Sequence, residues 1–169
     1  GIYCVAIVGD GWHRSDTGFD ARTPCEPGTM IKKRPISFID KGVDALLGRD
    51  HRTVLTRARN SPARFDYAQV TQAAIGEYSG ALPVLPCVVP NWDNTPRCGN
   101  AGFLFSDASP ELYQNHLRQA VEFVSNRPTQ ERFVLIKSWN EWAEGNHLEP
   151  DRHHGRAYLE ALAASLGIE

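Results

Sequence analysis

The chain has 169 residues, of which 41% are hydrophobic and 22% are charged, so it is long enough to fold around a core of its own. A formal net charge of −2 provides no basic surface that would attract nucleic acid or an anionic membrane. No run in the sequence approaches the roughly 20 apolar residues of a membrane-spanning helix, so no membrane span is expected in this segment.

Four apolar runs are expected to be strands. They are Ile2–Val8, the short run Gly18–Ala21, Pro83–Val89 and Phe133–Lys137. The long runs are continuously apolar rather than alternating, which is typical of strands that are covered on both faces, as in parallel sheets.

Three segments place apolar residues at helical spacing, namely Phe65–Tyr78, Ser109–Ser125 and Arg156–Leu166. The second begins with Ser109 at the N-cap position and Pro110 in the first turn, and both residues favour a helix start. Strands that alternate with helices predict an α/β fold with a parallel sheet.

Residues 23–60 do not fit this alternation. They are polar and rich in Pro, Arg and Lys, which predicts a long irregular excursion. Four strands with interleaved helices would form the C-terminal half of a (β/α)8, or TIM-type, barrel, which as a whole usually takes about 250 residues. We therefore expect residues 1–169 to be one partial barrel, a fragment that needs the missing half.

The start at Gly1 rather than Met suggests that upstream sequence is missing, together with any targeting segment. Cytoplasmic and periplasmic or cell-surface locations both stay open.

The strand Phe133–Lys137 runs directly into a cluster of acidic and aromatic residues. Glu141 and Glu144 are three positions apart, so a helical turn would project both carboxylates from one face. Trp139, Asn140 and Trp142 surround them, and an indole face stacks on the apolar face of a sugar ring. Glycoside hydrolysis usually needs two carboxyl groups at the scissile bond, so we expect Glu141 and Glu144 to be catalytic. The alternative is an exposed helix start, because Glu-x-x-Glu pairs are common on solvated helices.

A second cluster follows the strand Pro83–Val89. Asp93, Asn94 and Arg97 are expected to bind sugar hydroxyls, and Trp92 is expected to offer a stacking face. The alternative is a simple turn, since Asn, Asp and Pro favour turns for backbone reasons. At the end of the first strand, Trp12 and His13 are weaker candidates for the rim of the same site.

No cofactor or metal is expected. The histidines 147, 153 and 154 show no metal-ligand spacing, and the sequence contains no Cys-x-x-Cys pair. Cys4 and Cys87 fit buried thiols, whereas a disulfide between Cys25 and Cys98 is a minor alternative.

The sequence resembles the WbsX-like proteins, which are related to glycoside hydrolase family 99. The resemblance rests on Trp139–Gly145, His147–Asp151 and Tyr158–Glu160, and on the blocks Trp92–Arg97 and Gly18–Ala21 in the same order. It implies a (β/α)8 barrel and a retaining enzyme that cleaves α-linked, mannan-like polysaccharide. Glu144 would be the general acid/base, and Glu141 would draw the proton from the sugar 2-hydroxyl, so that an anhydro-sugar forms. Ala143 departs from the polar residue that the hydrolases carry there.

Two other functions stay open. WbsX-like proteins are also labelled glycosyltransferases of lipopolysaccharide or O-antigen synthesis, although this sequence has no Asp-x-Asp pair and no glycine-rich phosphate loop. A barrel that binds an oligosaccharide or polysaccharide without cleaving it is the other alternative.

Overall fold

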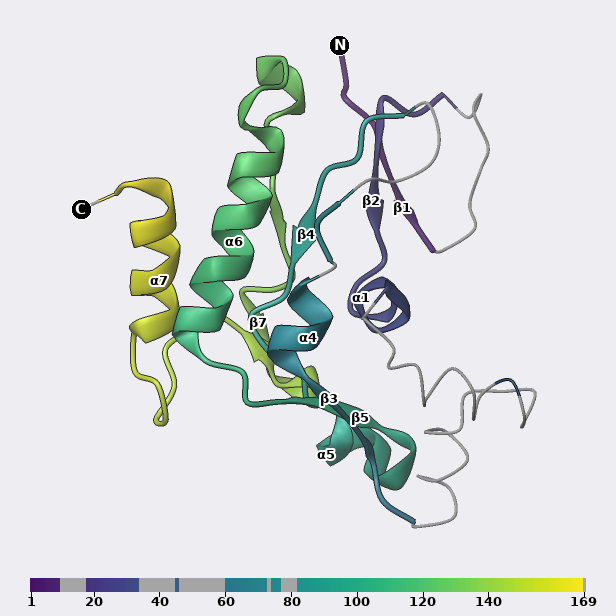
Figure 1. Ribbon diagram of the computed structural model, residues 1–169, viewed down its shortest axis with the longest axis vertical. Coiled ribbons are helices and arrows are strands. Elements are labelled where there is room, and N and C mark those ends of the chain that lie inside the picture. The colour runs from purple at the N-terminus through teal and green to yellow at the C-terminus, as the bar shows by residue number, and fades with distance from the viewer. Residues whose placement is uncertain (10–17, 34–44, 46–59, 73, 77–81, 169) are drawn as a thin grey trace.

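Four short parallel strands form the spine of the fold (Figure 1). The computed structural model describes residues 1–9, 18–33, 45, 60–72, 74–76 and 82–168. Strand β1 (Val5–Val8) pairs with β2 (Ala21–Pro24), and β4 (Cys87–Val88) pairs with β6 (Leu135–Ile136). A single parallel bridge between Arg22 and Val84 joins the two pairs. The spatial order is therefore β1–β2–β4–β6, and each strand overlaps or directly follows one of the four predicted runs.

A second parallel pair was not predicted. Strand β3 (Ala63–Asp66) pairs with β5 (Phe103–Ser106). The predicted helix Phe65–Tyr78 is consequently wrong at its start, because helix α4 spans only Tyr67–Gln72. The Asp66 side chain accepts a hydrogen bond from the Gln69 N–H at 2.8 Å, and this contact marks the change from strand to helix.

The two long predicted helices are confirmed. Helix α6 (Pro110–Ser125) begins as expected, because the Ser109 side chain accepts a hydrogen bond from the Leu112 N–H. Helix α7 (Ala157–Leu166) ends at Gly167, whose φ of +65° suits glycine. The two helices lie side by side in Figure 1 and pack over β4 and β6.

Within residues 23–60, the structure describes a short helix α1 (Gly28–Lys33), whereas residues 34–44 and 46–59 of the predicted excursion lie outside the described residues. Its first turn buries Thr29 and Met30, so this part of the interval belongs to the core. Sequence periodicity could not identify it, because six residues are too few to show a helical repeat.

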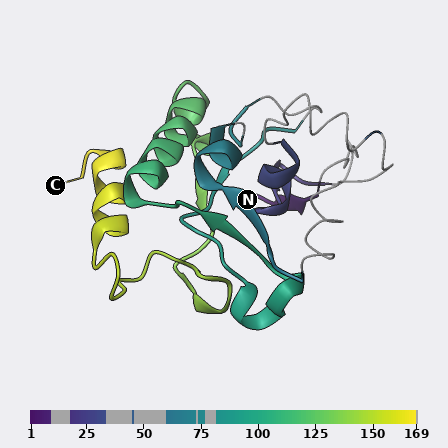
Figure 2. The same cartoon turned by 60° about the horizontal axis from the view of Figure 1, so that its bottom comes forward.

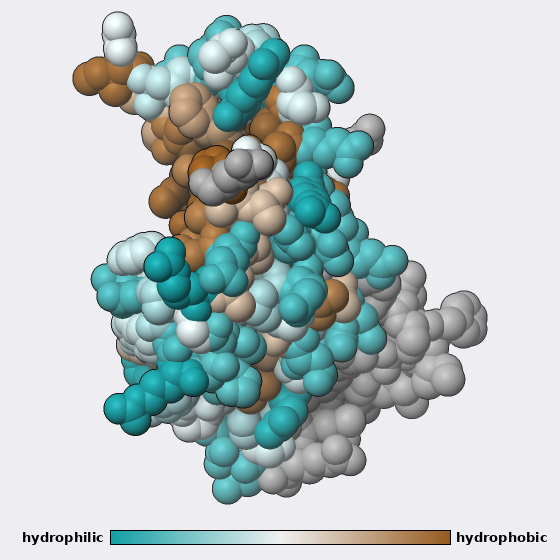
Figure 3. Space-filling model, turned by 90° about the vertical axis from the view of Figure 1, so that its left-hand side faces the viewer, coloured by the Kyte–Doolittle hydropathy of each residue, from teal (hydrophilic) through white to brown (hydrophobic). Residues whose placement is uncertain are grey.

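The hydrophobic core has two parts. One lies around β3 and β5 and includes Met30 and Tyr67. The other lies between α6, α7 and β4 and includes Leu117 and Tyr158. A groove of about 480 Å³ opens between α6, α7 and the segment around β6, with mainly apolar walls. Figure 3 shows apolar side chains gathered in the upper part of the face that carries α7.

The described residues establish a mixed α/β fold but no closed barrel. Their strands form four two-stranded sheets, the last of which is the antiparallel hairpin β7 (Asn140–Glu141) and β8 (Asn146–His147). Figure 2 shows this hairpin close to the short helix α5 (Thr95–Cys98), so the segments that follow β4 and β6 meet on one side of the molecule. No helix in the described part of the chain is long and apolar enough to cross a membrane.

Candidate active site

The segments that follow β4 and β6 are joined by a direct backbone contact. The Asp93 N–H donates to the Glu144 carbonyl oxygen at 2.7 Å. Gly145 has a φ of +55°, and a Cβ added there would lie 3.1 Å from the backbone nitrogen and oxygen of Asp93. Only glycine combines that φ with so close an approach. Gly145 therefore allows the two predicted clusters to come together.

Glu144 lies at the centre of this junction, at the end of the short 3₁₀ turn η3 (Trp142–Glu144). Its side chain is 16% exposed, and its two oxygens face different cations. Arg97 Nη2 lies 2.6 Å from Oε1, and Lys137 Nζ lies 3.7 Å from Oε2. Both cations therefore lie within ion-pair distance of this one carboxyl group.

Glu141 lies on the same loop but in more open surroundings. It is an exposed residue at the end of β7, and its N–H donates to the Ser138 hydroxyl at 3.1 Å. The expected helical turn exists only as η3, and Glu141 precedes it. Trp139 and Trp142 on the same loop are 52% and 49% exposed. Glu141 thus belongs to a surface that combines carboxylates with accessible indole rings.

The indole ring of Trp142 is held by its neighbours. Its Nε1–H donates to Glu149 Oε2 at 2.7 Å, and its ring stacks on His147 with 3.7 Å between the ring centroids. His147 Nε2 lies 3.1 Å from Asp151 Oδ2, which fixes the imidazole in turn. A ring that is anchored on one side and half exposed can serve as a stacking platform for a sugar.

The predicted stacking role of Trp92 needs correction. Trp92 is only 4% exposed, its ring stacks on Phe103 at a centroid distance of 5.5 Å, and Lys137 Nζ lies 4.9 Å from the ring centroid. The indole is a core residue beneath the site, so it offers no open face to a sugar. Sequence alone could not distinguish the two roles, because a Trp after a buried strand fits either of them.

The other residues of this cluster make mainly internal contacts. Asp93 Oδ1 accepts hydrogen bonds from the N–H and the hydroxyl of Thr95, as in a turn that starts a helix. Asn94 is buried and its Oδ1 accepts from the Phe103 N–H at 2.8 Å, so its predicted contact with sugar hydroxyls is also corrected. Arg97 is 54% exposed and contacts Glu144.

The remaining predicted residues are placed differently. Asn140 is exposed and pairs with His147 across the hairpin. Trp12 and His13 lie outside the described residues.

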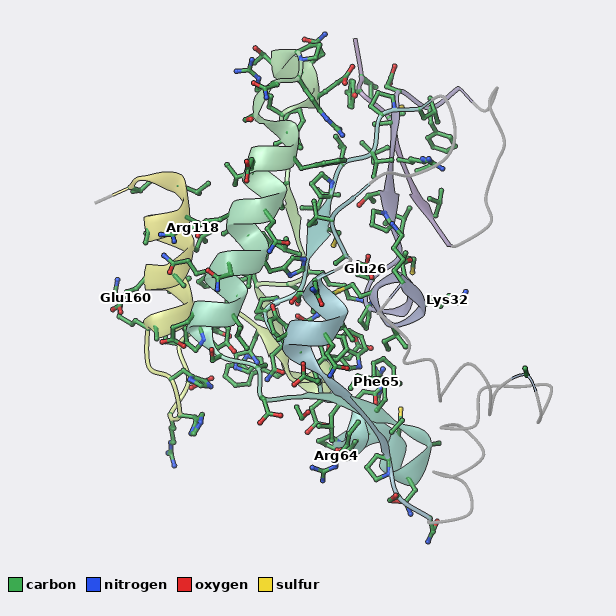
Figure 4. The ribbon with its side chains drawn as sticks, viewed as in Figure 1. Glu26, Lys32, Arg64, Phe65, Arg118 and Glu160 are labelled. Atoms are coloured by element: carbon green, nitrogen blue, oxygen red, sulfur yellow. The ribbon has the colours of Figure 1, made fainter. Side chains whose placement is uncertain are left out.

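Sequence analysis missed two charged residues near this junction, Lys137 beside Glu144 and Glu26 beside Lys137. Lys137 directly follows β6, and its ammonium also donates to the Glu26 carbonyl oxygen at 3.3 Å. Glu26 lies between β2 and α1 (Figure 4) and is 3% exposed. Burial raises the pKa of its carboxyl from 4.5 to about 7, although Oε2 accepts a hydrogen bond from the Met30 N–H at 2.8 Å. The signal for Lys137 was a lone charge at the end of an apolar strand.

The cysteines are all reduced. Cys25 and Cys98 are free and exposed, so the alternative of a disulfide between them is wrong for this structure. Cys87 is buried as expected, and burial raises the pKa of its thiol to about 12. In the described part of the chain, no three His, Cys, Asp or Glu side chains converge as metal ligands would.

Comparison with solved structures shows a related fold. A glycoside hydrolase-like protein superposes with a TM-score of 0.54 and 15% sequence identity, over 98% of this chain and 44% of the other. At that identity the likeness supports a shared fold only.

Comparison of sequences leads to a family. Two relatives are uncharacterized proteins WxcX from Xanthomonas campestris pv. campestris, strains B100 and ATCC 33913, each 44% identical over 82 residues. Those matches cover 48% of this chain and 12% of each relative, so the chain spans only a small part of their length. The family description Glycosyltransferase WbsX matches residues 1–162, and the chain therefore belongs to the WbsX glycosyltransferase family.

Proposed function

We propose that this protein of a carbohydrate-active family is a retaining glycoside hydrolase that cleaves an α-linked, mannan-like polysaccharide. The observation that carries the proposal is the loop after β6, which holds Glu141 and Glu144 together with two half-exposed indoles. Glycoside hydrolases usually combine two catalytic carboxyl groups with aromatic rings that stack on the sugar. The glycoside hydrolase-like fold of the solved relative agrees with this chemistry.

The proposed roles of the two carboxylates follow from the resemblance to family 99. Glu144 protonates the glycosidic oxygen, so the leaving group departs as an alcohol, and in the second step Glu144 accepts a proton from the attacking water. Glu141 accepts the proton of the sugar 2-hydroxyl, whose oxygen attacks the anomeric carbon and expels the leaving group, giving an anhydro-sugar. Water then opens this ring at the anomeric carbon, and Glu141 returns its proton to the 2-oxygen. Trp142, and Trp139 beside it, would stack on sugar rings.

We also propose that the chain forms half of a (β/α)8 barrel. The parallel order β1–β2–β4–β6 and the two helices α6 and α7 that pack over it support this architecture. In such barrels the catalytic side chains lie at the carboxyl ends of the strands, where Lys137 and the loop with Glu141 and Glu144 follow β6.

Two substitutions test the catalytic roles in the intact protein. Glu144→Gln and Glu141→Gln should each lower the rate of α-mannan cleavage about 10²- to 10⁴-fold, the range expected for a lost proton-transfer group. Glu160→Gln is the matched control, because Glu160 is an exposed carboxylate on α7 (Figure 4). Reducing-end release measures the rate. Full activity of either site variant would exclude its catalytic role, and glycan binding without cleavage in the unsubstituted protein would favour a non-catalytic barrel.

A sugar-transfer reaction is the second candidate, and the pair of cations at Glu144 is the observation in its favour. Arg97 and Lys137 are both partly exposed and could neutralise the diphosphate of a nucleotide sugar. Calorimetric binding of a nucleotide sugar, lost in Arg97→Met, would support transfer, whereas cleavage of α-mannan without any nucleotide sugar would support hydrolysis.

A further inference from the structure

Lys137 contacts three different parts of the molecule through one side chain. Its ammonium lies 3.7 Å from Glu144 Oε2, donates to the Glu26 carbonyl oxygen at 3.3 Å, and lies 4.9 Å from the centroid of the Trp92 ring. Its own N–H donates to the Val88 carbonyl oxygen at 2.9 Å, which ties the backbone to β4. The position of the ammonium is thus set by the core rather than by Glu144 alone.

The second cation at Glu144 is held differently. Arg97 lies on a four-residue helix and is 54% exposed, whereas Lys137 is 39% exposed. The two bind opposite oxygens of one carboxylate, Arg97 at Oε1 and Lys137 at Oε2. The Arg97 contact at Oε1 is the shorter of the two, at 2.6 Å, but its guanidinium is also the more exposed group and makes no contact with the core like those of Lys137. A substrate can therefore take its place at Oε1, because an exposed ion pair contributes little free energy.

We propose that Lys137 is a positioning residue for the site: it keeps Oε2 of Glu144 in place, while Oε1 exchanges its contact with Arg97 for a contact with the glycosidic oxygen. This inference rests on the proposed glycosidase function. It makes Lys137 a fixed anchor and Arg97 a partner that is released when the substrate binds. A displacement of a reacting group by about 1 Å can cost about 100-fold in rate, so loss of the anchor should affect turnover.

The competing explanation is an ordinary surface ion pair. A nitrogen–oxygen distance of 3.7 Å is too long for a strong hydrogen bond, and exposed pairs are worth about 0–1 kcal/mol. Both explanations predict almost no change in the thermal midpoint when Lys137 is replaced. Stability therefore cannot separate them, and kinetics can.

The test compares Lys137→Met with the conservative variant Lys137→Arg in the intact protein. Lys137→Met should lower kcat for glycan cleavage about 10- to 100-fold with KM changed less than about threefold, because positioning is lost while the sugar platform remains. Lys137→Arg should recover most of kcat. Arg118→Met, which removes an exposed cation of α6, is the control and should match the unsubstituted protein. An unchanged kcat in Lys137→Met, or an equal loss in Lys137→Arg, would overturn the proposal.

A readout that needs no substrate separates this inference from the proposed function. Carbon-13 NMR of labelled glutamate follows the ionisation of Glu26, whose carboxyl is influenced by Lys137. Removing the cation in Lys137→Met should move the titration midpoint of Glu26 upward, because the charge of Lys137 lowers the pKa of that carboxyl, and Lys137→Arg should restore it. If this shift occurs and no glycan is cleaved, the ammonium of Lys137 lies beside Glu26 as the anchor requires, and the glycosidase function fails. If no shift occurs, the ammonium of Lys137 is not held beside Glu26, and the proposal that Lys137 is a positioning residue is wrong.

Discussion

Glu26 is a single buried residue that should make stability depend on pH. Its carboxyl has a pKa of about 7 in the folded protein because of burial, which outweighs the Met30 N–H bond and the charges of Lys33 and Lys137. Near pH 4.5 the unfolded chain already releases this proton, so the folded state binds it more tightly. The contribution of Glu26 to the free energy of unfolding is therefore fully present below pH 4.5 and is lost as the pH rises to about 7.

Glu26→Gln should remove this dependence. The amide cannot ionise, and its oxygen can still accept from the Met30 N–H. Denaturant unfolding at pH 5 and pH 7.5 should show the unsubstituted protein losing up to about 3 kcal/mol over that range relative to the variant. Glu160→Gln serves as the control, and equal pH slopes in the unsubstituted protein and Glu26→Gln would contradict the buried, protonated carboxyl.

At the level of residues, Glu141, Glu144 and Trp142 were singled out because they follow an apolar strand. The structure places them on one loop with exposed indole rings, and their catalytic and binding roles stay a prediction. Trp92 was placed wrongly, since only tertiary packing against Phe103 shows that its ring is covered. Glu26 could not be found at all, because its burial depends on contacts with α1 and β6.

Helix α6 carries a buried histidine that should make the protein less stable as the pH falls, which is the opposite of the effect of Glu26. His116 is 1% exposed, packs near Tyr67, and neither of its ring nitrogens has a hydrogen-bond partner within the described residues. Burial lowers the pKa of its imidazole from 6.5 to about 4. Below pH 6.5 the imidazole binds a proton in the unfolded chain but not in the folded one. The contribution of His116 to the free energy of unfolding is therefore lost as the pH falls from 6.5 to 4.

His116→Leu should therefore flatten the acid side of the stability curve. Thermal unfolding at pH 7.5 and pH 5 should show a smaller fall in midpoint for the variant than for the unsubstituted protein, because leucine has no charge to gain. His153→Gln is the control, as His153 is an exposed histidine. A fall as large in His116→Leu as in the unsubstituted protein would mean that His116 does not drive acid unfolding.

At the level of elements, local signals predicted the long helices and the four apolar strands, whereas the pair β3–β5 depends on a long-range contact that no local signal shows. The cap at Ser109 and the spacing through α6 are local, so its start was correct. Strand β3 depends on its partner β5, which lies 40 residues further along the chain according to the register Ala63↔Phe103. The helical spacing that begins at Phe65 outweighed the strand character of only four residues.

The whole molecule leaves apolar surface open at both ends of the strand order. Ile7 in β1 and Ile2 before it are 76% and 89% exposed, and Leu135 in β6 is 37% exposed. An α/β architecture followed from the alternation of strands and helices, but closure of a barrel depends on strands that the described residues do not contain. The sequence could therefore predict a mixed α/β fold with parallel strand pairs better than the complete architecture.

This open surface predicts self-association of the 169-residue chain when it is expressed alone. The groove between α6 and α7 has Phe133 and Leu166 on its wall, and these residues are 51% and 50% exposed. Burying such a patch against a second copy is favoured by the hydrophobic effect. The double variant Phe133→Lys, Leu166→Lys should therefore weaken association in sedimentation velocity at least severalfold. Ile168→Lys, a 59% exposed residue outside the groove lining, should change it less. A monodisperse monomer at high protein concentration would contradict the prediction that the chain associates through this groove.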